Sequence, residues 1–304
     1  MGMGPEQHYL QELIDHGLLI SMGVDGVYGR SAVFEDVLDR FGALVTPWGR
    51  ENGAEAIRFP PVMNRHHFEQ SGYLKNFPHL AGTIHCFHGD ERDHLDLRRK
   101  LEAGEDWTQG QKAIAIVVTP AACYSLYPMV TKRGTLPETG ALFDVYSWCL
   151  RHEPSQDPAR MQLFRMREYV LVGTPEQVMA FREAWITRGR ALMGSLGLPL
   201  TFAVANDPFF GRQGKLLASS QREQSLKFEM LIPITSTEKP TACLSFNYAQ
   251  DYFGVLWGIR TADGNPAHSA CVAFGMERIA LALFKHHGFD PAGWPSAVRA
   301  VLWP

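Results

Sequence analysis

The sequence has no apolar segment long enough to cross a membrane. Its longest apolar run, AIAIVVTPAAC at 113–123, is well short of the roughly 20 residues that a spanning helix needs. The first residues, MGMGPEQHYLQELIDHG, also lack the apolar core of a secretory signal. We therefore expect no membrane association and a cytoplasmic location.

Cysteine is scarce, and its distribution excludes a disulfide framework. The chain of 304 residues contains five, an odd number, spread from end to end: Cys86, Cys123, Cys149, Cys243 and Cys271. Small disulfide-bonded domains instead carry an even number at close spacing. The pattern predicts reduced thiols.

The sequence also lacks any block of like charge. Its formal net charge is -3 at pH 7, and charged residues make up 20% of the chain. Affinity for a long nucleic acid comes largely from clustered Lys and Arg, so such binding is not expected. The hydrophobic content of 45% is enough for a large core, in one big domain or two.

Helix and strand signals alternate along the chain. A helix is predicted over 31–42, SAVFEDVLDRFG, because Ser31 can cap it and Gly42 can end it. The patterns at 55–59 and 112–118 predict strands, the second of them buried. The capping box TPEQ at 174–177 begins another helix.

Later segments complete the predicted fold. Strands are expected within 141–153, 225–234, 242–248 and 268–275, and a helix over 277–288. Strands joined by hairpins and long loops, with helices between some of them, predict an α+β fold with a mainly antiparallel sheet flanked by helices. A helical insertion is expected at about 174–222.

The segment RMQLFRMREYVLVG at 160–173 places a carboxylate among apolar residues. With a period of two, Phe164, Glu168 and Val170 share one face of a strand, whereas Arg165 and Arg167 take the other. An unpaired buried carboxylate is costly, so Glu168 needs a partner. From the residues alone, the most ordinary partner is an Arg on a neighbouring strand.

Three segments in chain order resemble the motifs of class II aminoacyl-tRNA synthetases. Residues 31–61 resemble motif 1, the dimer element; CLRHEPSQDPARMQLFRMREYV at 149–170 resembles motif 2; and CVAFGMERIALALF at 271–284 resembles motif 3. More narrowly, TPAACYSLYPMV, GTLPETGALFDVYSWCLRHE and PTACLSFNY resemble the amino acid:[carrier protein] ligases, which are short homologues of the archaeal-type seryl-tRNA synthetase catalytic core. The resemblance implies one catalytic domain over 1–304 and a homodimer.

The resemblance also implies a zinc site. The positions that match the family's metal ligands are Cys123, Glu168 and Cys271. Three protein ligands leave a fourth position open, as in catalytic zinc sites, and the ion would hold the amino group of the substrate. Without the resemblance, both cysteines would be interpreted as buried structural thiols. A second group of ligand types, HCFH at 85–88 with His94, has no supporting pattern, and these residues are interpreted as loop or substrate-channel residues.

Ten residues match the family's ATP contacts. Arg151 matches the arginine that grips the α-phosphate, Phe164 would stack under adenine and Arg278 would cover its other face. Arg151 and Arg278 are thus the expected catalytic residues. The other expected ATP contacts are Glu153, Arg160, Met161, Ala242, Cys243, Leu244 and Ser245. Taken alone, Arg151 and Glu153 would be an ordinary ion pair and Phe164 an ordinary core residue.

The sequence departs from the family at the magnesium site. The synthetases usually carry a magnesium-binding acid near the start of the stretch matching PTACLSFNY, where Thr241 or Ala242 stands here. Glu229 and Glu238 are the candidate substitutes for an Mg²⁺ ligand.

The resemblance implies ATP-dependent activation of a small amino acid, glycine or alanine, and its transfer to the phosphopantetheine thiol of a carrier protein, with no tRNA expected. A basic face with Arg182, Arg188 and Arg190 on the helix after Thr174, continued by Arg212 and Lys215, is a candidate docking surface for an acidic carrier protein; the alternative is a solvated helix face. Two other functions stay open: a truncated seryl-tRNA synthetase-like tRNA ligase, and a non-catalytic paralogue that senses amino acids.

Overall fold

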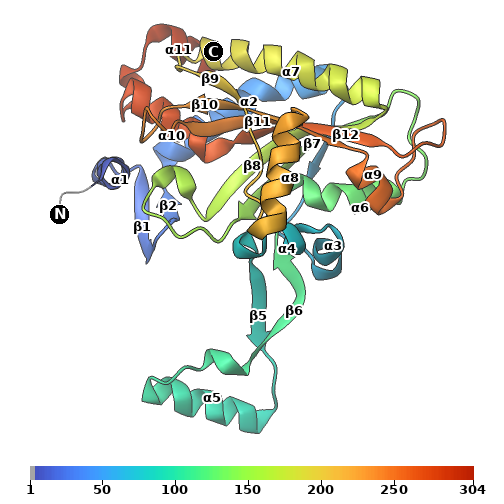
Figure 1. The fold of residues 1–304 in the computed structure, drawn as a ribbon. Helices are drawn as coiled ribbons and strands as arrows, with labels where there is room; N and C mark the ends of the chain where they lie inside the picture. The colour runs from blue at the N-terminus through green and yellow to red at the C-terminus, as the bar shows by residue number, and fades with distance from the viewer. Residues whose placement is uncertain (1–3) are drawn as a thin grey trace.

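A seven-stranded sheet forms the centre of the computed structural model, which describes residues 4–304 (Figure 1). Neighbouring strands are antiparallel, except that β3 runs parallel to β7. This arrangement confirms the predicted α+β fold. The strands, in spatial order, are β3 (Glu55–Arg58), β7 (Ala141–Leu150), β8 (Leu163–Gly173), β12 (His268–Gly275), β11 (Thr241–Gln250), β10 (Lys227–Ile232) and β9 (Thr201–Val204).

Long helices cover one face of this sheet. They are α2 (Ala32–Glu51), α7 (Pro175–Ser195) and α10 (Met276–His287), with the shorter α11 (Ser296–Leu302) beside them. Tyr169 of β8 stacks on Trp185 of α7, and both rings meet Phe274 of β12. Because strand residues alternate between faces, Glu168 must point to the opposite face from Tyr169.

Helix α2 is longer than predicted. Ser31 caps it as expected, but the helix continues through Gly42 to Glu51. A glycine ends a helix by taking a left-handed conformation, and Gly42 is not among the glycines with positive φ. Val45 and Trp48 extend the apolar stripe onto the core, so tertiary packing carries the helix past the glycine.

Short elements cover the other face. The turn η3 (Ala122–Ser125) contacts β7 and β8, and α9 (Tyr252–Trp257) contacts β11 and β12. The remaining elements on this side are α3 (Arg65–Gln70), α4 (Tyr73–Asn76), η1 (Pro78–Leu80), α6 (Leu126–Thr131) and α8 (Gly211–Glu223).

The segment predicted as a helical insertion at about 174–222 is not wholly helical. Its first part is α7, which begins at the expected capping box and packs on the central sheet. The strand β9 then pairs with β10 at the sheet edge, and only α8 lies apart. The segment therefore contributes α7 to one face of the sheet, α8 to the other face and β9 to the sheet itself.

A projecting arm extends away from the sheet (Figure 1). It is built from β4 (Val62–Asn64), β5 (Thr83–Phe87) and β6 (Gln111–Val118), with α5 (Glu91–Ala103) and η2 (Thr108–Gly110) at its tip. The strand predicted at 112–118 exists, but of its residues only Val117 is buried. The prediction of a buried strand was wrong because the arm has no second layer.

The first described helix contacts the turn η4 (Pro158–Arg160), and the last one, α11, contacts α2. The N-terminal elements are α1 (Pro5–Asp15), β1 (Leu19–Val24) and β2 (Val27–Arg30). The turns η4 and η5 (Pro291–Gly293) complete the fold. Among residues 4–304, no helix combines the length and the apolar character needed to cross a bilayer.

A buried ion-pair network joins the three motif segments. Glu277, at the start of α10, accepts hydrogen bonds from the backbone N–H and the Nε of Arg165 on β8, at 2.7 and 2.9 Å. Arg165 also donates to Glu35 of α2 at 2.8 Å, and Arg30 of β2 lies 3.3 Å from Glu277. Both guanidinium groups lie over the ring of Trp148. Two arginines and two glutamates thus balance their charges where the segments meet.

Replacing Glu277 by alanine should strongly destabilise the protein. The change removes the buried carboxylate that faces both Arg165 and Arg30, and breaking a buried pair costs about 3–5 kcal/mol. Urea unfolding followed by tryptophan fluorescence measures the loss. The matched control is Arg40→Ala, which removes an exposed pair with Asp36 and should cost less than about 1 kcal/mol. Equal losses in the two variants would contradict a special role for the network.

Candidate active site

Two adjacent cavities lie on the face of the sheet opposite α7. The first, here called the thiol cavity, has a volume of about 210 Å³ and is lined by Cys123, Glu168 and Cys271 among others. The second, the arginine cavity, has a volume of about 320 Å³ and is lined by Arg151 and Arg278 among others. The residues that line both cavities are Arg151, Met166, Asp207, Pro208, Lys227, Ser245 and Ala273. The two cavities therefore adjoin along these residues.

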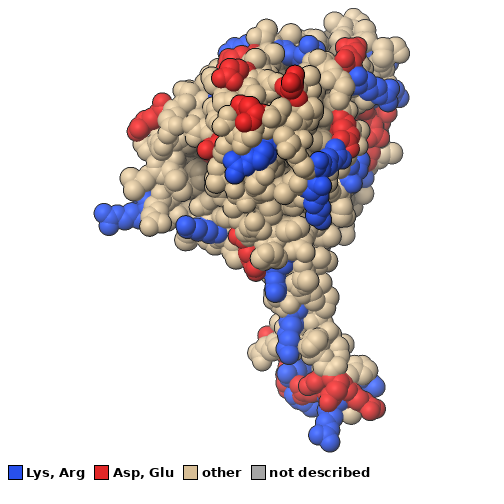
Figure 2. All heavy atoms as spheres, turned by 90° about the vertical axis from the view of Figure 1, so that its right-hand side faces the viewer, with Lys and Arg blue, Asp and Glu red and all other residues tan. Residues whose placement is uncertain are grey.

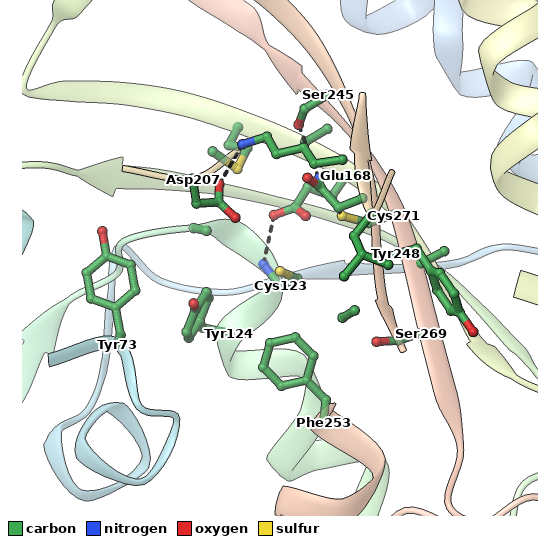
Figure 3. Close-up of a pocket in the computed structure, with 18 of the residues that line it drawn as sticks. Tyr73, Cys123, Tyr124, Glu168, Asp207, Ser245, Tyr248, Phe253, Ser269 and Cys271 are labelled. Carbon is green, nitrogen blue, oxygen red and sulfur yellow. Dashed lines mark hydrogen bonds and ion pairs between the residues drawn. The ribbon is translucent and has the colours of Figure 1, made fainter. Parts of the chain in front are cut away.

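The three predicted zinc ligands come together in the thiol cavity (Figure 3). Glu168 points here because β8 alternates, and Cys271 stands on the neighbouring strand β12, where Ala273 pairs with Glu168. Cys123 comes from η3, whose backbone N–H donates to Glu168 Oε1 at 3.0 Å. Residues separated by more than a hundred positions in sequence thus share one wall.

Glu168 is buried and its hydrogen-bond partners are neutral. The side chain is 2% exposed. Burial raises the pKa of its carboxyl above the usual value, and hydrogen bonds from the Cys271 and Cys123 thiols offset part of this rise. Burial also raises the pKa of both thiols, and the nearby Glu168 raises it further. Asn247 donates to Cys271 Sγ at 3.3 Å.

The structure does not show a formed metal-binding group. Across residues 4–304, no three His, Cys, Asp or Glu side chains are arranged to hold an ion. The three predicted zinc ligands line the same cavity, and a hydrogen bond between them runs from the Cys123 backbone to Glu168. The other sequence candidates, His85, Cys86, His88 and His94, are exposed in the projecting arm.

All ten predicted ATP contacts line the arginine cavity. The Arg151 guanidinium lies 5.5 Å from the centre of the Phe164 ring and donates from Nε to Pro120 O at 3.3 Å. Arg278 donates to Ala159 O at 2.8 Å and to Ala242 O at 3.0 Å. Carbonyl groups from two separate segments therefore fix the Arg278 side chain.

The remaining predicted contacts divide into rim and wall. At the rim, Arg160 is largely exposed and lies 3.6 Å from Glu153. In the wall, Met161, Cys243 and Leu244 are buried. Burial raises the pKa of Cys243 to about 12, so its thiol is neutral at physiological pH. Such buried groups shape the cavity rather than carry charge into it.

The sequence did not reveal a charged pair at the junction of the cavities. Lys227 Nζ lies 2.5 Å from Asp207 Oδ1 and 3.3 Å from Glu229 Oε1. Burial alone would lower the pKa of Lys227, but Asp207 and Glu229 outweigh it and raise that pKa. Burial alone would raise the pKa of Asp207, but Lys227 and Gln221 hold it below its usual value. The available signal was the alternation of Lys227 and Glu229 in an otherwise apolar strand.

Of the two candidate magnesium ligands, only Glu229 lies at the site. Glu229 lines the arginine cavity beside Lys227. Glu238 is exposed in the loop between β10 and β11.

The predicted basic docking face is divided by the sheet. Arg182 is buried and donates to Ser225 O, so it is not part of a solvated face. Arg188 and Arg190 are exposed on α7, on the face of the sheet away from both cavities. Arg212 and Lys215 belong to α8, whose Gln221 lines the thiol cavity. Figure 2 shows positive and negative side chains interspersed rather than gathered on the face it presents.

Solved structures with the same fold define the class of this protein. A seryl-tRNA synthetase from Methanopyrus kandleri, solved with a tRNA from A. aeolicus, matches with a TM-score of 0.81 and 19% identity over 97% of this chain and 60% of that one. A seryl-tRNA synthetase from Pyrococcus horikoshii, solved with ATP, matches with a TM-score of 0.69 and 14% identity over 99% and 64%. The chain has the class II aminoacyl-tRNA synthetase-like fold.

Curated relatives then show the family. Amino acid--[acyl-carrier-protein] ligase 1 of Bradyrhizobium diazoefficiens is 51% identical over 94% of this chain and 87% of that protein. Ligase 2 of the same organism is 50% identical over 98% and 89%. No protein-family model matches the chain. The chain belongs to the amino acid--[acyl-carrier-protein] ligases, and it is therefore a ligase.

Proposed function

We propose that this ligase uses ATP to activate a small amino acid, glycine or alanine, and transfers it to the phosphopantetheine thiol of a carrier protein. The supporting observation is that the two cavities adjoin and that Arg151 lines both. One cavity holds the residues that match amino-group ligands, and the other holds all those that match ATP contacts. In this proposal the whole chain acts as one catalytic domain.

In the first step, a carboxylate oxygen of the amino acid attacks the α-phosphorus of ATP. The new P–O bond replaces the bond to pyrophosphate, which leaves with the electron pair. Arg151 lines both cavities and is fixed by the Pro120 carbonyl, so it can contact the α-phosphate where the reactants meet. Lys227 lies at the same junction and supplies a second positive charge. When bound, Mg²⁺ would balance the charge of the outer phosphates, and Glu229 in the cavity wall is its candidate ligand.

In the second step, the acceptor sulfur attacks the carbonyl carbon of the aminoacyl-adenylate. A C–S bond forms, the C–O bond to phosphate breaks, and AMP leaves with the electron pair while the thiol proton passes to solvent. The products are a thioester and AMP. No protein nucleophile is needed, because positioning and charge stabilisation suffice.

Replacing Arg278 by alanine should lower amino-acid-dependent pyrophosphate exchange by about 100-fold or more, because a fixed cation over the nucleotide is lost. Exchange is measured with glycine and with alanine. The matched control is Arg188→Ala on the opposite face, which should leave exchange unchanged. Absence of exchange in the wild-type protein with every small amino acid would contradict the proposal.

The same preparations separate the three candidate functions. Aminoacylation is measured side by side with purified holo-carrier protein and with total tRNA. The proposal expects thioester on the carrier protein alone. Charging of tRNA would favour the truncated synthetase, and binding of amino acid without exchange would favour the sensor.

We also propose that Cys123, Glu168 and Cys271 bind one zinc ion. Two thiols and a carboxylate are a suitable donor set, and three ligands leave a position for the substrate. The buried Glu168, whose hydrogen-bond partners are neutral, fits the same interpretation because a cation would offset its charge. When bound, the ion would supply that charge and an open position for a neutral amine, after the thiols have lost their protons.

Metal analysis tests the zinc proposal independently of activity. Protein purified without chelator should contain close to one zinc ion per chain, and Cys271→Ser should lower this content at least about tenfold. The control is Cys86→Ser, which changes an exposed thiol in the projecting arm and should keep the metal. A wild-type protein that takes up no zinc from a zinc-containing buffer would contradict the proposal.

A homodimer is part of the proposal as well. The strand β3, which matches motif 1, lies at the edge of the central sheet, and its residues are largely exposed. Light scattering of the purified chain measures the mass in solution.

A further inference from the structure

A buried hydroxyl in the thiol cavity has no partner. Tyr73 is 4% exposed and lines this cavity. Among residues 4–304, its hydroxyl oxygen has no hydrogen-bond partner. Buried hydroxyl groups are nearly always hydrogen-bonded, because leaving one unpaired costs free energy. An unpaired hydroxyl at a cavity wall is therefore a candidate contact for a ligand.

The ring of Tyr73 is held in a fixed position. Its centre lies 5.4 Å from that of Phe68, 4.9 Å from that of Phe77 and 5.4 Å from that of Tyr124. Phe77 in turn stacks on Phe209, with ring centres 5.0 Å apart. Phe209 lies two residues after Asp207, in the loop at the cavity junction. Figure 3 shows the Tyr73 hydroxyl rising from its helix toward the level of Asp207. The hydroxyl is thus placed before any ligand arrives.

The neighbours of Tyr73 show which part of the reaction it faces. The charged groups that act on its hydroxyl include Arg151 and Asp207, at the junction of the cavities. Tyr127, by contrast, is acted on by Cys123, Cys271 and Glu168, at the opposite end. Figure 3 shows Tyr73 on the side of the cavity that holds Asp207, away from Cys271, where the amino group is proposed to bind. It does not line the arginine cavity, so it is not placed to touch ATP.

Because Tyr73 is placed to contact neither the amino group nor ATP, the reactant that can reach its hydroxyl is the acceptor. A thiol that attacks the carbonyl carbon near Arg151 must enter the thiol cavity, since the nucleotide fills the other one. In a pantetheine arm, an ethylene linker separates the sulfur from the nearest amide, so that amide enters the same cavity. Burial raises the pKa of Tyr73 to about 12, and the hydroxyl is a neutral donor under working conditions. A neutral donor suits an amide carbonyl.

We propose that the Tyr73 hydroxyl donates a hydrogen bond to the amide carbonyl nearest the thiol of the pantetheine arm. This inference rests on the proposed function. It makes Tyr73 a positioning residue for the acceptor and leaves activation of the amino acid to the residues of the other cavity.

The experiment compares two acceptors that differ in this amide. Pantetheine contains it, whereas cysteamine carries the same thiol and ethylene linker without it. Amino-acid-dependent AMP formation is measured against acceptor concentration for the wild type and for Tyr73→Phe. In the variant, the KM for pantetheine should rise by roughly 3- to 10-fold more than the KM for cysteamine does. This is the effect expected from the loss of one neutral hydrogen bond. Transfer to holo-carrier protein should fall by a similar factor.

Two controls separate this contact from a structural role. Tyr252→Phe removes a hydroxyl that donates to Ser71 O, next to the turn that carries Tyr73, and should not distinguish the acceptors. Because the Tyr73 hydroxyl has no partner in the free protein, Tyr73→Phe should not lower the melting temperature.

An equal effect of Tyr73→Phe on both acceptors, or no effect on either, would overturn the inference alone. A wild-type protein that performs pyrophosphate exchange but transfers to neither pantetheine nor carrier protein would overturn both the inference and the proposed acceptor.

Discussion

The buried pair between Arg165 and Glu277 is the constraint on which the site depends. Arg165 lies on one face of β8, next in sequence to Phe164 on the other, and Glu277 directly precedes Arg278. Fixing this pair therefore fixes two of the residues matched to adenine at the same time. Glu35 and Arg30 extend the pair to the first motif segment, so the three segments cannot move independently.

The two faces of β8 have different roles: one packs in the core and the other lines the cavities. Tyr169 lies on the face of the strand that packs in the core against α2 and α7. Phe164, Met166 and Glu168 lie on the other face and line the cavities. One strand thus runs along both the arginine cavity and the thiol cavity. This explains how a carboxylate among apolar residues is tolerated: its face of the strand is a wall of the site, with thiols beside it.

Sequence alone predicted the elements with strong local signals and the residues within recognisable motifs. The capping box at Thr174 and the alternation at 160–173 are local patterns, and both are found in the structure. The continuation of α2 past Gly42 was missed because tertiary packing decides it. Arg182, Arg188 and Arg190 were grouped because they share a helix, but a helical pattern does not reveal which face of a sheet the helix covers. Lys227 and Asp207 meet only because a loop without pattern folds over β10.

The central claim is that the two cavities act as one site for an aminoacyl-adenylate. Calorimetric titration of the zinc-loaded protein with a non-hydrolysable glycyl-sulfamoyl adenosine, with AMP and with glycine tests it most directly. If one molecule spans both cavities, the joined ligand gains the contacts of both parts, and it should bind at least about 100-fold more tightly than AMP. An affinity equal to that of AMP would contradict the account.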